Sequence, residues 1–233
     1  MFQVRYQEEY TLLYDIHSGL PQGSILGPIL YTLYTADLTE TEQTLTATYA
    51  DDTAILTSHH DPIVATEQLQ YHLSLIEQWL KRWRIRANET KSTHITFTLR
   101  RDDCPTVYLN GKHIPQDTTV KYLGIHLDRR LTWKTHIITK RKQLGLLLQR
   151  MYGILGRKSE FSLVNKVLLY KTILKSIWTY GIPLWGSTSR SNIEILQRFQ
   201  NKVLRTIVNA SWYIPNRFLH TDLQIPTIRE EIT

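Results

Sequence analysis

Two adjacent aspartates, Asp51 and Asp52, are the residues of this 233-residue chain whose type and setting most clearly suit chemistry. They lie between two short apolar stretches, residues 45–49 and 53–56, which predict the arms of a β-hairpin. Two carboxylates held together at the edge of a buried sheet are electrostatically costly unless a cation neutralises them or one takes up a proton. Mg²⁺ prefers such oxygen ligands, and its chemistry is typically phosphoryl transfer. The pair therefore indicates a metal-dependent phosphoryl-transfer site.

Adjacency of acids is not by itself a signal in this chain. Glu8-Glu9, Asp102-Asp103 and Glu230-Glu231 are also adjacent pairs. Asp102-Asp103 follows two arginines and precedes Cys104-Pro105, a setting typical of a solvated turn. The apolar stretches on both sides are what distinguish Asp51-Asp52.

The segments before and after the aspartates predict how the hairpin is held. Residues 18–24 are too rich in glycine and proline for regular structure and predict a loop. Apolar residues at three- and four-residue steps from Leu26 to Ala36 then predict a helix. Asp61 and Pro62 suit the N-cap and first turn of an amphipathic helix that continues to Trp83.

Beyond this helix the pattern changes from strands to helices. We expect a strand at 95–99, a hairpin at 107–114 with Asn110-Gly111 at its turn, and a strand at 120–127. Apolar periodicity predicts three later helices, and Ser191 with Glu194 suits a capping box for the last. The apolar positions of these helices are Ile137, Leu144, Leu148 and Met151; Leu163, Val167, Tyr170, Leu174 and Ile177; and Leu196, Phe199, Val203 and Ile207. The predicted class is α+β over residues 1–128, followed by a basic helical unit over 129–233.

Charge is divided unevenly between the two halves. Residues 1–60 contain one basic residue and eight acids, whereas residues 129–205 contain sixteen lysines and arginines and two acids. Such an excess favours a polyanionic partner such as nucleic acid, although a solvated basic face gives the same composition. One cysteine excludes an internal disulfide and a multi-thiolate zinc site and favours a reducing compartment. No apolar run suits a membrane span, and the first residues do not form a signal peptide, so we expect no membrane partner.

Two motifs in order resemble the palm of a reverse transcriptase. The loop Gly19-Leu20-Pro21-Gln22-Gly23-Ser24-Ile25-Leu26-Gly27-Pro28 is followed by Tyr49-Ala50-Asp51-Asp52, as in the jockey-like group of non-LTR (LINE-type) retrotransposons. Weaker matches cover nearly the whole chain: Asn88 with Lys91, Tyr122-Leu123-Gly124-Ile125, Tyr180-Gly181, Trp185-Gly186, Trp212-Tyr213, His220, Asp222 and Leu223. The resemblance implies the C-terminal part of the palm, an antiparallel sheet with helices, over 1–128, and an all-helical thumb with its following region over 129–233.

The resemblance also implies an activity, RNA-directed DNA polymerisation, and its partners. These are an RNA template, a DNA primer, deoxynucleoside triphosphates and Mg²⁺, with Mn²⁺ as a possible substitute. It implies that Asp51 and Asp52 are the metal ligands and catalytic carboxylates, and that Lys91 is a cation or proton donor for the leaving pyrophosphate. It implies that the nucleotide and template are contacted by Pro21, Gln22, Gly23, Ser24 and Tyr49. It also implies a primer grip formed by Tyr122, Leu123 and Gly124, and contacts to the nucleic-acid backbone from Lys140, Arg141 and Lys142.

The chain departs from the family pattern at its start. Fingers, an earlier palm strand with another metal-binding aspartate, and an upstream endonuclease do not fit into the 18 residues before Gly19. Because metal affinity depends on the full ligand set, we expect this chain alone to lack polymerase activity and to need those segments as partners.

Two alternatives remain. A non-catalytic nucleic-acid-binding remnant of the same element would keep the basic helices while the aspartates are inert. The other is another polymerase type, such as a group II intron or telomerase relative or a viral RNA-copying enzyme. Tyr49-Ala50 before the aspartates argues against the viral enzyme, and the region from Trp212 to Leu223 favours the retrotransposon over the others. The family's way of copying at a chromosomal nick implies nuclear localisation.

Overall fold

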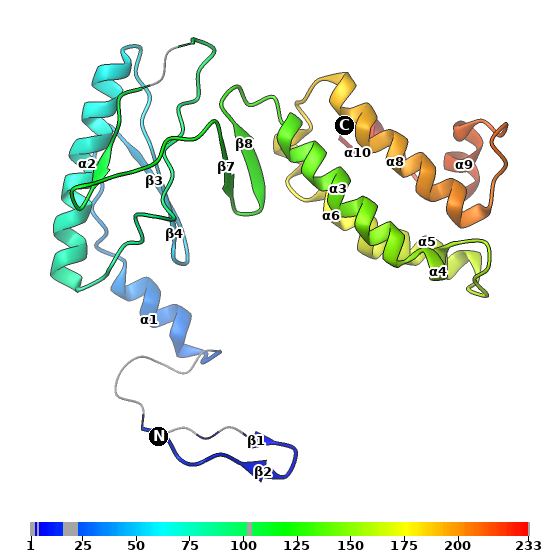
Figure 1. Cartoon of the computed structure of the whole chain (residues 1–233), viewed down its shortest axis with the longest axis horizontal. Coiled ribbons are helices and arrows are strands. Elements are labelled where there is room, and N and C mark those ends of the chain that lie inside the picture. The colour runs from blue at the N-terminus through cyan, green and yellow to red at the C-terminus, as the bar shows by residue number, and fades with distance from the viewer. Residues whose placement is uncertain (1–2, 4, 16–22, 102–103, 233) are drawn as a thin grey trace. The chain divides into compact units, whose positions relative to one another are not determined.

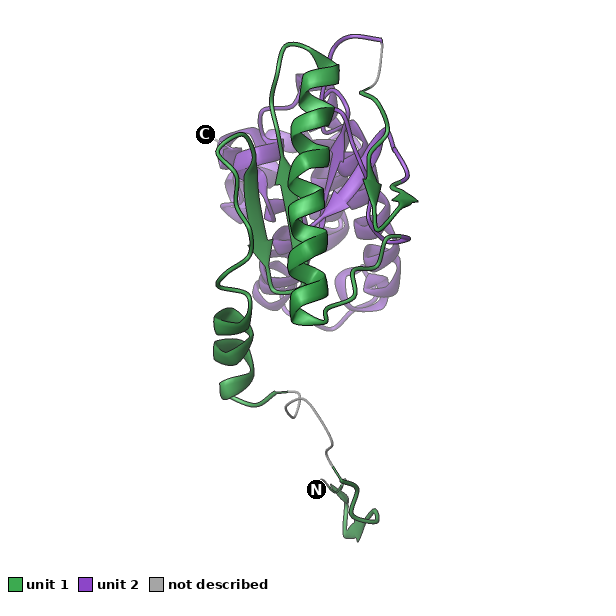
Figure 2. Ribbon diagram, turned by 90° about the vertical axis from the view of Figure 1, so that its left-hand side faces the viewer, with its two compact units in different colours: residues 1–89, 104–114 green, residues 90–103, 115–233 purple. Residues whose placement is uncertain are grey.

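The computed structural model describes residues 3, 5–15, 23–101 and 104–232. These residues form two compact units, one of residues 1–89 with 104–114 and one of residues 90–103 with 115–233 (Figure 2). We call them the first and second unit and describe each by itself. Within the described part, every sheet is a two-stranded antiparallel hairpin and helices form much of the rest, which agrees with an α+β class.

The described residues of the first unit form three hairpins and two helices (Figure 1). In chain order these are β1 (Arg5–Tyr6), β2 (Glu9–Tyr10), α1 (Leu26–Tyr34), β3 (Leu45–Tyr49), β4 (Asp52–Leu56), α2 (Pro62–Trp83), β5 (Tyr108–Leu109) and β6 (Lys112–His113). The predicted hairpin at 45–56 and the helices starting near Leu26 and Pro62 are confirmed. Asn110 and Gly111 both have positive φ, 52° and 72°, as the predicted Asn-Gly turn requires.

Helix α2 is the centre of the first unit. Its start is capped by Asp61, whose Oδ1 accepts a hydrogen bond from the Ile63 amide at 2.9 Å. One face buries Leu73 beside Val107, which precedes β5, and Leu109 of β5, and the next turns bury Ile76, Trp79 and Leu80. The predicted apolar face therefore forms core.

Polar side chains fix the segment between α1 and β3 to α2. The buried His72 binds Thr44 Oγ1 through Nδ1 at 2.6 Å and the Thr39 carbonyl through Nε2 at 2.8 Å. The Asp37 carboxylate accepts hydrogen bonds from the indole N–H groups of Trp79 and Trp83, at 2.8 and 3.0 Å. The bond from Trp79 is the largest cause that lowers the pKa of Asp37. These contacts place the start of β3.

The second unit is one further hairpin and a helical bundle. Its elements are β7 (Thr119–Tyr122), β8 (Ile125–Asp128), α3 (Lys134–Arg150), α4 (Tyr152–Leu155), α5 (Leu163–Leu169), the π-helical η1 (Tyr170–Lys175), α6 (Ser176–Thr179), α7 (Ile182–Trp185), α8 (Arg190–Val208), α9 (Asn216–Leu223) and α10 (Ile228–Ile232). Figure 1 shows α3, α8 and the continuous run of α5, η1 and α6 side by side. All three bury their apolar residues in one core, which contains Leu144, Leu174 and Val203.

Two strand predictions are wrong. Residues 95–99 form no strand, because they make only isolated backbone bonds, such as Thr98 N to the Arg129 carbonyl at 3.1 Å, and no continuous ladder. Residues 120–127 are not one strand but the two strands β7 and β8. Leu123 and Gly124 have φ of 45° and 78°, so the backbone reverses there in a two-residue turn.

Two details of the predicted helices also differ. The capping box Ser191–Glu194 is absent, because α8 begins at Arg190, before Ser191. The Asn192 side chain, bonded to the Thr132 carbonyl and Thr188 Oγ1, sets this earlier start. The helix predicted around Leu163–Ile177 is present but changes to π-helical geometry at Tyr170.

None of the helices formed by the described residues is both long enough and apolar enough to cross a lipid bilayer.

We expect Leu144→Ala to destabilise the second unit by about 2–5 kcal/mol, because Leu144 is fully buried and the substitution leaves a cavity. Urea denaturation measures this change. Leu146→Ala on the same helix is the control: Leu146 is 62% exposed, so its truncation changes stability by about 0.5 kcal/mol or less. Equal effects of the two substitutions would contradict the described core.

Candidate active site

The two aspartates lie at the tip of the β3–β4 hairpin. Five residue pairs form the ladder, from Leu45 with Leu56 at the open end to Tyr49 with Asp52 at the tip. Ala50 and Asp51 therefore make a two-residue turn, and Ala50 takes the left-handed conformation that this turn requires, with φ 49°. Tyr49, Asp51 and Asp52 are all exposed. The hairpin thus presents two adjacent carboxylates to solvent.

The hairpin is anchored at its open end and braced at its tip. Ile55 packs against both apolar clusters of α2, which fixes β4 to the core of the first unit. At the tip, the Tyr31 hydroxyl of α1 donates a hydrogen bond to the Ala50 carbonyl at 2.9 Å. This bond joins the helix after the Gly/Pro loop directly to the turn that carries Asp51.

Tyr31 is a positioning residue that sequence reasoning missed. The apolar residues Leu26, Leu30 and Leu33 predicted the helix, but Tyr31 lies off their stripe and carried no signal of its own. Its partner on the next turn, Tyr34, donates to the Trp83 carbonyl at the end of α2. Two tyrosines three residues apart on the helix before the hairpin are the pattern that could have indicated these contacts.

A second hairpin offers a natural comparison for the first. Tyr6 pairs with Glu9 across the turn Gln7-Glu8, as Tyr49 pairs with Asp52 across Ala50-Asp51. Gln7 also has a positive φ, 56°. Among the residues of the first unit that the structure describes, adjacent acids at a two-residue turn thus occur twice. A specific metal site must distinguish Asp51-Asp52 from Glu8-Glu9.

The predicted nucleotide-binding loop is described only from Gly23 onward. Pro21 and Gln22 lie outside the described residues. Gly23 has φ 88° and open space where a Cβ would stand, so a side chain there is disfavoured by backbone conformation rather than by crowding. The Ser24 carbonyl accepts from the Gly27 amide at 3.2 Å, next to the start of α1.

The remaining predicted residues belong to the second unit. Lys91 is exposed and lies in a turn of the second unit. Among the described residues of the first unit, the β3–β4 hairpin brings Tyr49, Asp51 and Asp52 together. In the described part of the chain, no three His, Cys, Asp or Glu side chains gather in a way that could hold a metal ion. Two carboxylate donors suit a hard divalent cation but supply only part of its ligands.

The predicted primer grip is the turn between β7 and β8. Tyr122, Leu123 and Gly124 are half-buried there, and the Leu123 carbonyl accepts a hydrogen bond from the Tyr180 hydroxyl at 2.7 Å. Gly181 follows with φ 69°, and a Cβ at this residue would lie 2.8 Å from Ile125 Cδ1. The motifs Tyr122–Ile125 and Tyr180-Gly181, which are 55 residues apart, therefore meet, and glycine is required at the contact.

The three predicted backbone-binding cations have different surroundings. Lys140 Nζ lies 5.4 Å from the centre of the Tyr180 ring, and the Arg141 guanidinium lies 4.6 Å from that of Phe199. Burial, and then the nearby charge of Lys121, lowers the pKa of Lys140. Lys142 is exposed. Only Lys142 of the three is freely presented to a phosphate.

Comparison with known proteins identifies the family of the chain. The sequence profile described as "Reverse transcriptase (RNA-dependent DNA polymerase)" matches residues 5–127, more than half of the chain. The chain belongs to the reverse transcriptase family. The match includes the β3–β4 hairpin and ends within β8.

The relatives of this chain include proteins of Drosophila transposons and mobile elements. It is 37% identical to "Probable RNA-directed DNA polymerase from transposon X-element" of Drosophila melanogaster over 99% of the chain and 26% of the relative. It is also 37% identical to "RNA-directed DNA polymerase from mobile element jockey" over 93% and 25%, and 36% identical to the corresponding protein of transposon BS over 100% and 27%, both from the same species. The chain spans about a quarter of the length of these relatives. The predicted likeness to jockey-like non-LTR elements is confirmed. No solved structure is a significant match.

A buried histidine joins the β7–β8 hairpin of the chain to α3. His136 is 1% exposed, and its Nδ1 accepts a hydrogen bond from the His126 amide at 3.2 Å. Burial, with the charges of Lys140 and His126, lowers the pKa of His136 to about 4. A proton on Nδ1 would also face the His126 N–H, so the neutral ring is the form that fits this contact.

We expect Tyr31→Phe to increase hydrogen–deuterium exchange at the amides of residues 49–53, because the turn loses its bond to α1. The free energy of unfolding should change by only about 0.5–1.5 kcal/mol, since one hydrogen bond is removed. Tyr34→Phe is the matched control, because it removes the bond to Trp83 on the same helix and should leave the turn unchanged. Unchanged exchange in Tyr31→Phe would show that the bond does not hold the turn.

We expect the second unit to lose stability as pH falls from about 6.5 to 4. The pKa of His136 is lower in the folded than in the unfolded state, so the unfolded state binds the proton first, an effect on the order of 3 kcal/mol. His136→Asn, whose Oδ1 can still accept from His126, should flatten urea-denaturation stability across this window. An unchanged slope in His136→Asn would show that another group causes the loss.

Proposed function

We propose that this chain carries the catalytic carboxylates of a non-LTR retrotransposon polymerase that copies RNA into DNA. The observation that carries the proposal is the β3–β4 hairpin, which presents Asp51 and Asp52 together at an exposed tip braced by Tyr31. The family match and the names of the relatives support this assignment. In this proposal residues 1–128 are the C-terminal part of the palm, and residues 129–233 are the thumb and its following region.

The proposed reaction is attack of a primer 3′ hydroxyl on the α-phosphate of a deoxynucleoside triphosphate, with pyrophosphate as the leaving group. Asp51 and Asp52 would hold Mg²⁺, or Mn²⁺ in its place, which when bound activates the attacking oxygen and stabilises the leaving one. Lys91 would assist the leaving pyrophosphate as a cation. The loop residues Pro21–Ser24 and Tyr49 would contact template and nucleotide, and the β7–β8 turn would support the primer.

Two carboxylates alone are an incomplete ligand set, and we propose that the missing donor comes from outside the described residues of this chain. Metal affinity and geometry depend on all ligands together. The isolated chain would then hold metal weakly and lack polymerase activity, while the longer protein of the element, acting in the nucleus, would be active.

Asp51→Asn in the chain extended by its upstream reading frame should lower primer extension on an RNA template by about 100-fold or more, because metal catalysis is worth several kcal/mol. Glu8→Gln is the matched control: it neutralises the same position of the other acidic turn and should leave extension unchanged. Extension that survives Asp51→Asn would refute the assignment. Template-directed incorporation by the isolated 233-residue chain would refute the proposed need for further segments.

A metal-binding measurement separates the site from the activity. Titration of the isolated chain with Mn²⁺ should broaden NMR amide signals of residues 49–53 more than those of residues 6–10, and Asp51→Asn should remove the difference. Equal broadening at both turns would show that the isolated hairpin has no specific site.

The alternative, a non-catalytic nucleic-acid-binding remnant, rests on the excess of lysine and arginine between residues 129 and 205. It predicts nucleic-acid binding that weakens steeply with salt together with no extension by the longer protein.

A further inference from the structure

Two neighbouring aromatic side chains of the second unit are left in solvent. Trp212 is 89% exposed and Tyr213 is 68% exposed. They are the central residues of a turn between α8 and α9, closed by a hydrogen bond from the Ile214 amide to the Ser211 carbonyl at 3.2 Å. Their rings are nearly perpendicular, 85°, with centroids 6.0 Å apart. Each ring can therefore offer a face without covering the other.

The turn is held rigidly although its aromatic side chains are free. The Arg205 guanidinium donates to the carbonyls on both sides of the pair, Ser211 at 2.7 Å and Ile214, and to Asn216 Oδ1 at 2.9 Å. Ile214 also packs against the core of the second unit. Because the turn is already braced, less conformational entropy is lost when a ligand binds the two rings.

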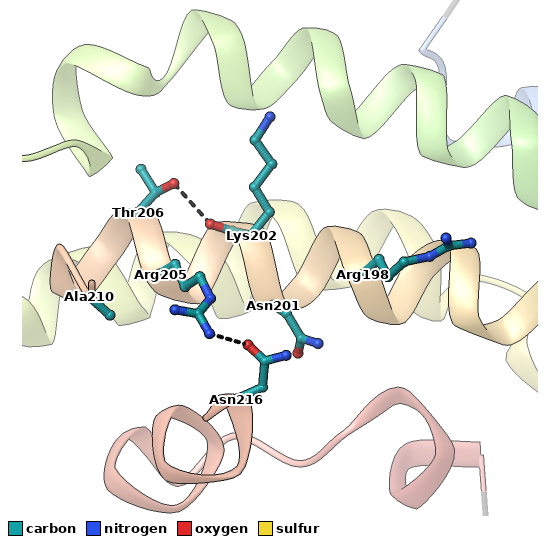
Figure 3. Close-up of a pocket in the computed structure, with 7 residues that line it drawn as sticks. All are labelled: Arg198, Asn201, Lys202, Arg205, Thr206, Ala210 and Asn216. Carbon is teal, nitrogen blue, oxygen red and sulfur yellow. Dashed lines mark hydrogen bonds between the residues drawn. The ribbon is translucent and has the colours of Figure 1, made fainter. Parts of the chain in front are cut away.

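A basic pocket adjoins the turn. It has a volume of about 470 Å³ and is lined by Arg198, Asn201, Lys202, Arg205, Thr206, Ala210 and Asn216 (Figure 3). Ala210 directly precedes the turn segment, and Asn216 follows it after Pro215. Figure 3 shows Arg205 directed toward Asn216, whereas Lys202 points away from it. Arg198 and Lys202 are exposed, and neither forms an ion pair with any carboxylate of the described residues. The lining contains three cations and no acid.

We infer that Trp212, Tyr213 and the adjoining pocket form a binding site for single-stranded nucleic acid, in which bases stack on the two rings and phosphates lie beside Arg198 and Lys202. Aromatic faces next to a cationic groove are the arrangement by which proteins bind unpaired strands without sequence preference. Arg205 is a positioning residue, because its donors are used by the turn. The site belongs to the region beyond the matched family profile, which ends at residue 127.

Charge is the reason to assign this surface to nucleic acid rather than to another protein segment. Exposed aromatic residues alone suit either partner. The pocket beside them, however, contains the exposed cations Arg198 and Lys202, which α8 places four residues apart along one stripe. A row of cations on a helix suits successive phosphates. The inference does not depend on polymerisation, since it concerns binding alone.

The test compares a short fluorescein-labelled oligouridine with an abasic oligonucleotide of the same length and charge, both titrated with the full chain. The wild-type chain should bind the strand with bases about tenfold or more tightly than the abasic one, because stacking strengthens binding at each base. Trp212→Ala/Tyr213→Ala should bring the two affinities together. Since both side chains are exposed, the thermal unfolding midpoint should not change.

The cations have a different signature. Arg198→Gln/Lys202→Gln should weaken both strands and reduce the slope of log affinity against log salt by roughly one to two. Matched controls on the same unit are Tyr152→Ala, at an aromatic residue 60% exposed, and Lys158→Gln/Lys171→Gln, at two exposed lysines. The controls should keep the preference for bases and lose less affinity.

Three outcomes would overturn the inference. These are no preference for bases in the wild-type chain, an unchanged preference in Trp212→Ala/Tyr213→Ala, and equal losses in the control variants. The second outcome would instead assign the exposed rings to contact with another protein segment. None of these results bears on Asp51, so failure here leaves the proposed polymerase function to its own test.

Discussion

The two-residue turn at Ala50 and Asp51 is the constraint on which the candidate site depends. Because Tyr49 pairs with Asp52, the turn has only two residues, and Ala50 must take a left-handed conformation. Asp51 is then held at the apex and Asp52 at the first position of β4, both beyond the core contacts of Ile55. Exposed carboxylates at a short turn need another contact to hold them in place. Among the described residues, the hydrogen bond from the Tyr31 hydroxyl to the Ala50 carbonyl holds this turn, and it links the geometry of the site to helix α1.

Hydrogen bonds likewise hold the β7–β8 hairpin to the helices of the second unit. The Asp128 carboxylate accepts from the amides of Thr132 and Trp133 at the start of α3, the buried His136 accepts from the β8 amide of His126, and Tyr180 binds the Leu123 carbonyl. Base, middle and tip of the hairpin are therefore each tied to helical residues. This explains why residues 119–128 form one compact unit with the helices. The predicted boundary between palm and thumb at residue 128 is a statement about family regions and stays a prediction.

Sequence reasoning succeeded where local chemistry decides the structure. The N-cap at Asp61, the Asn110-Gly111 turn and the apolar stripes of α2, α3 and α8 follow from nearest neighbours and periodicity. It failed where distant contacts decide. Leu123-Gly124 turns because Tyr180, 57 residues later, binds its carbonyl, and α8 starts early because Asn192 reaches Thr132. For the candidate site, the motif predicted Asp51 and Asp52, but Tyr31 could be found only from its contact, and Pro21 and Gln22 stay predictions.

The structure also changes the meaning of the basic composition. A count of charges along the sequence gives every lysine and arginine between residues 129 and 205 the same weight. In the structure, several of these side chains bind other groups of the protein. Lys166 is buried and donates to the Gly156 carbonyl at 3.1 Å, Lys175 pairs with Glu231 at 2.7 Å, and Arg205 braces the Trp212 turn. Lys140 and Arg141 lie over aromatic rings. The cations left for a polyanion are exposed ones such as Lys142, Arg198 and Lys202, so nucleic-acid binding by this unit should depend on fewer residues than its net charge suggests.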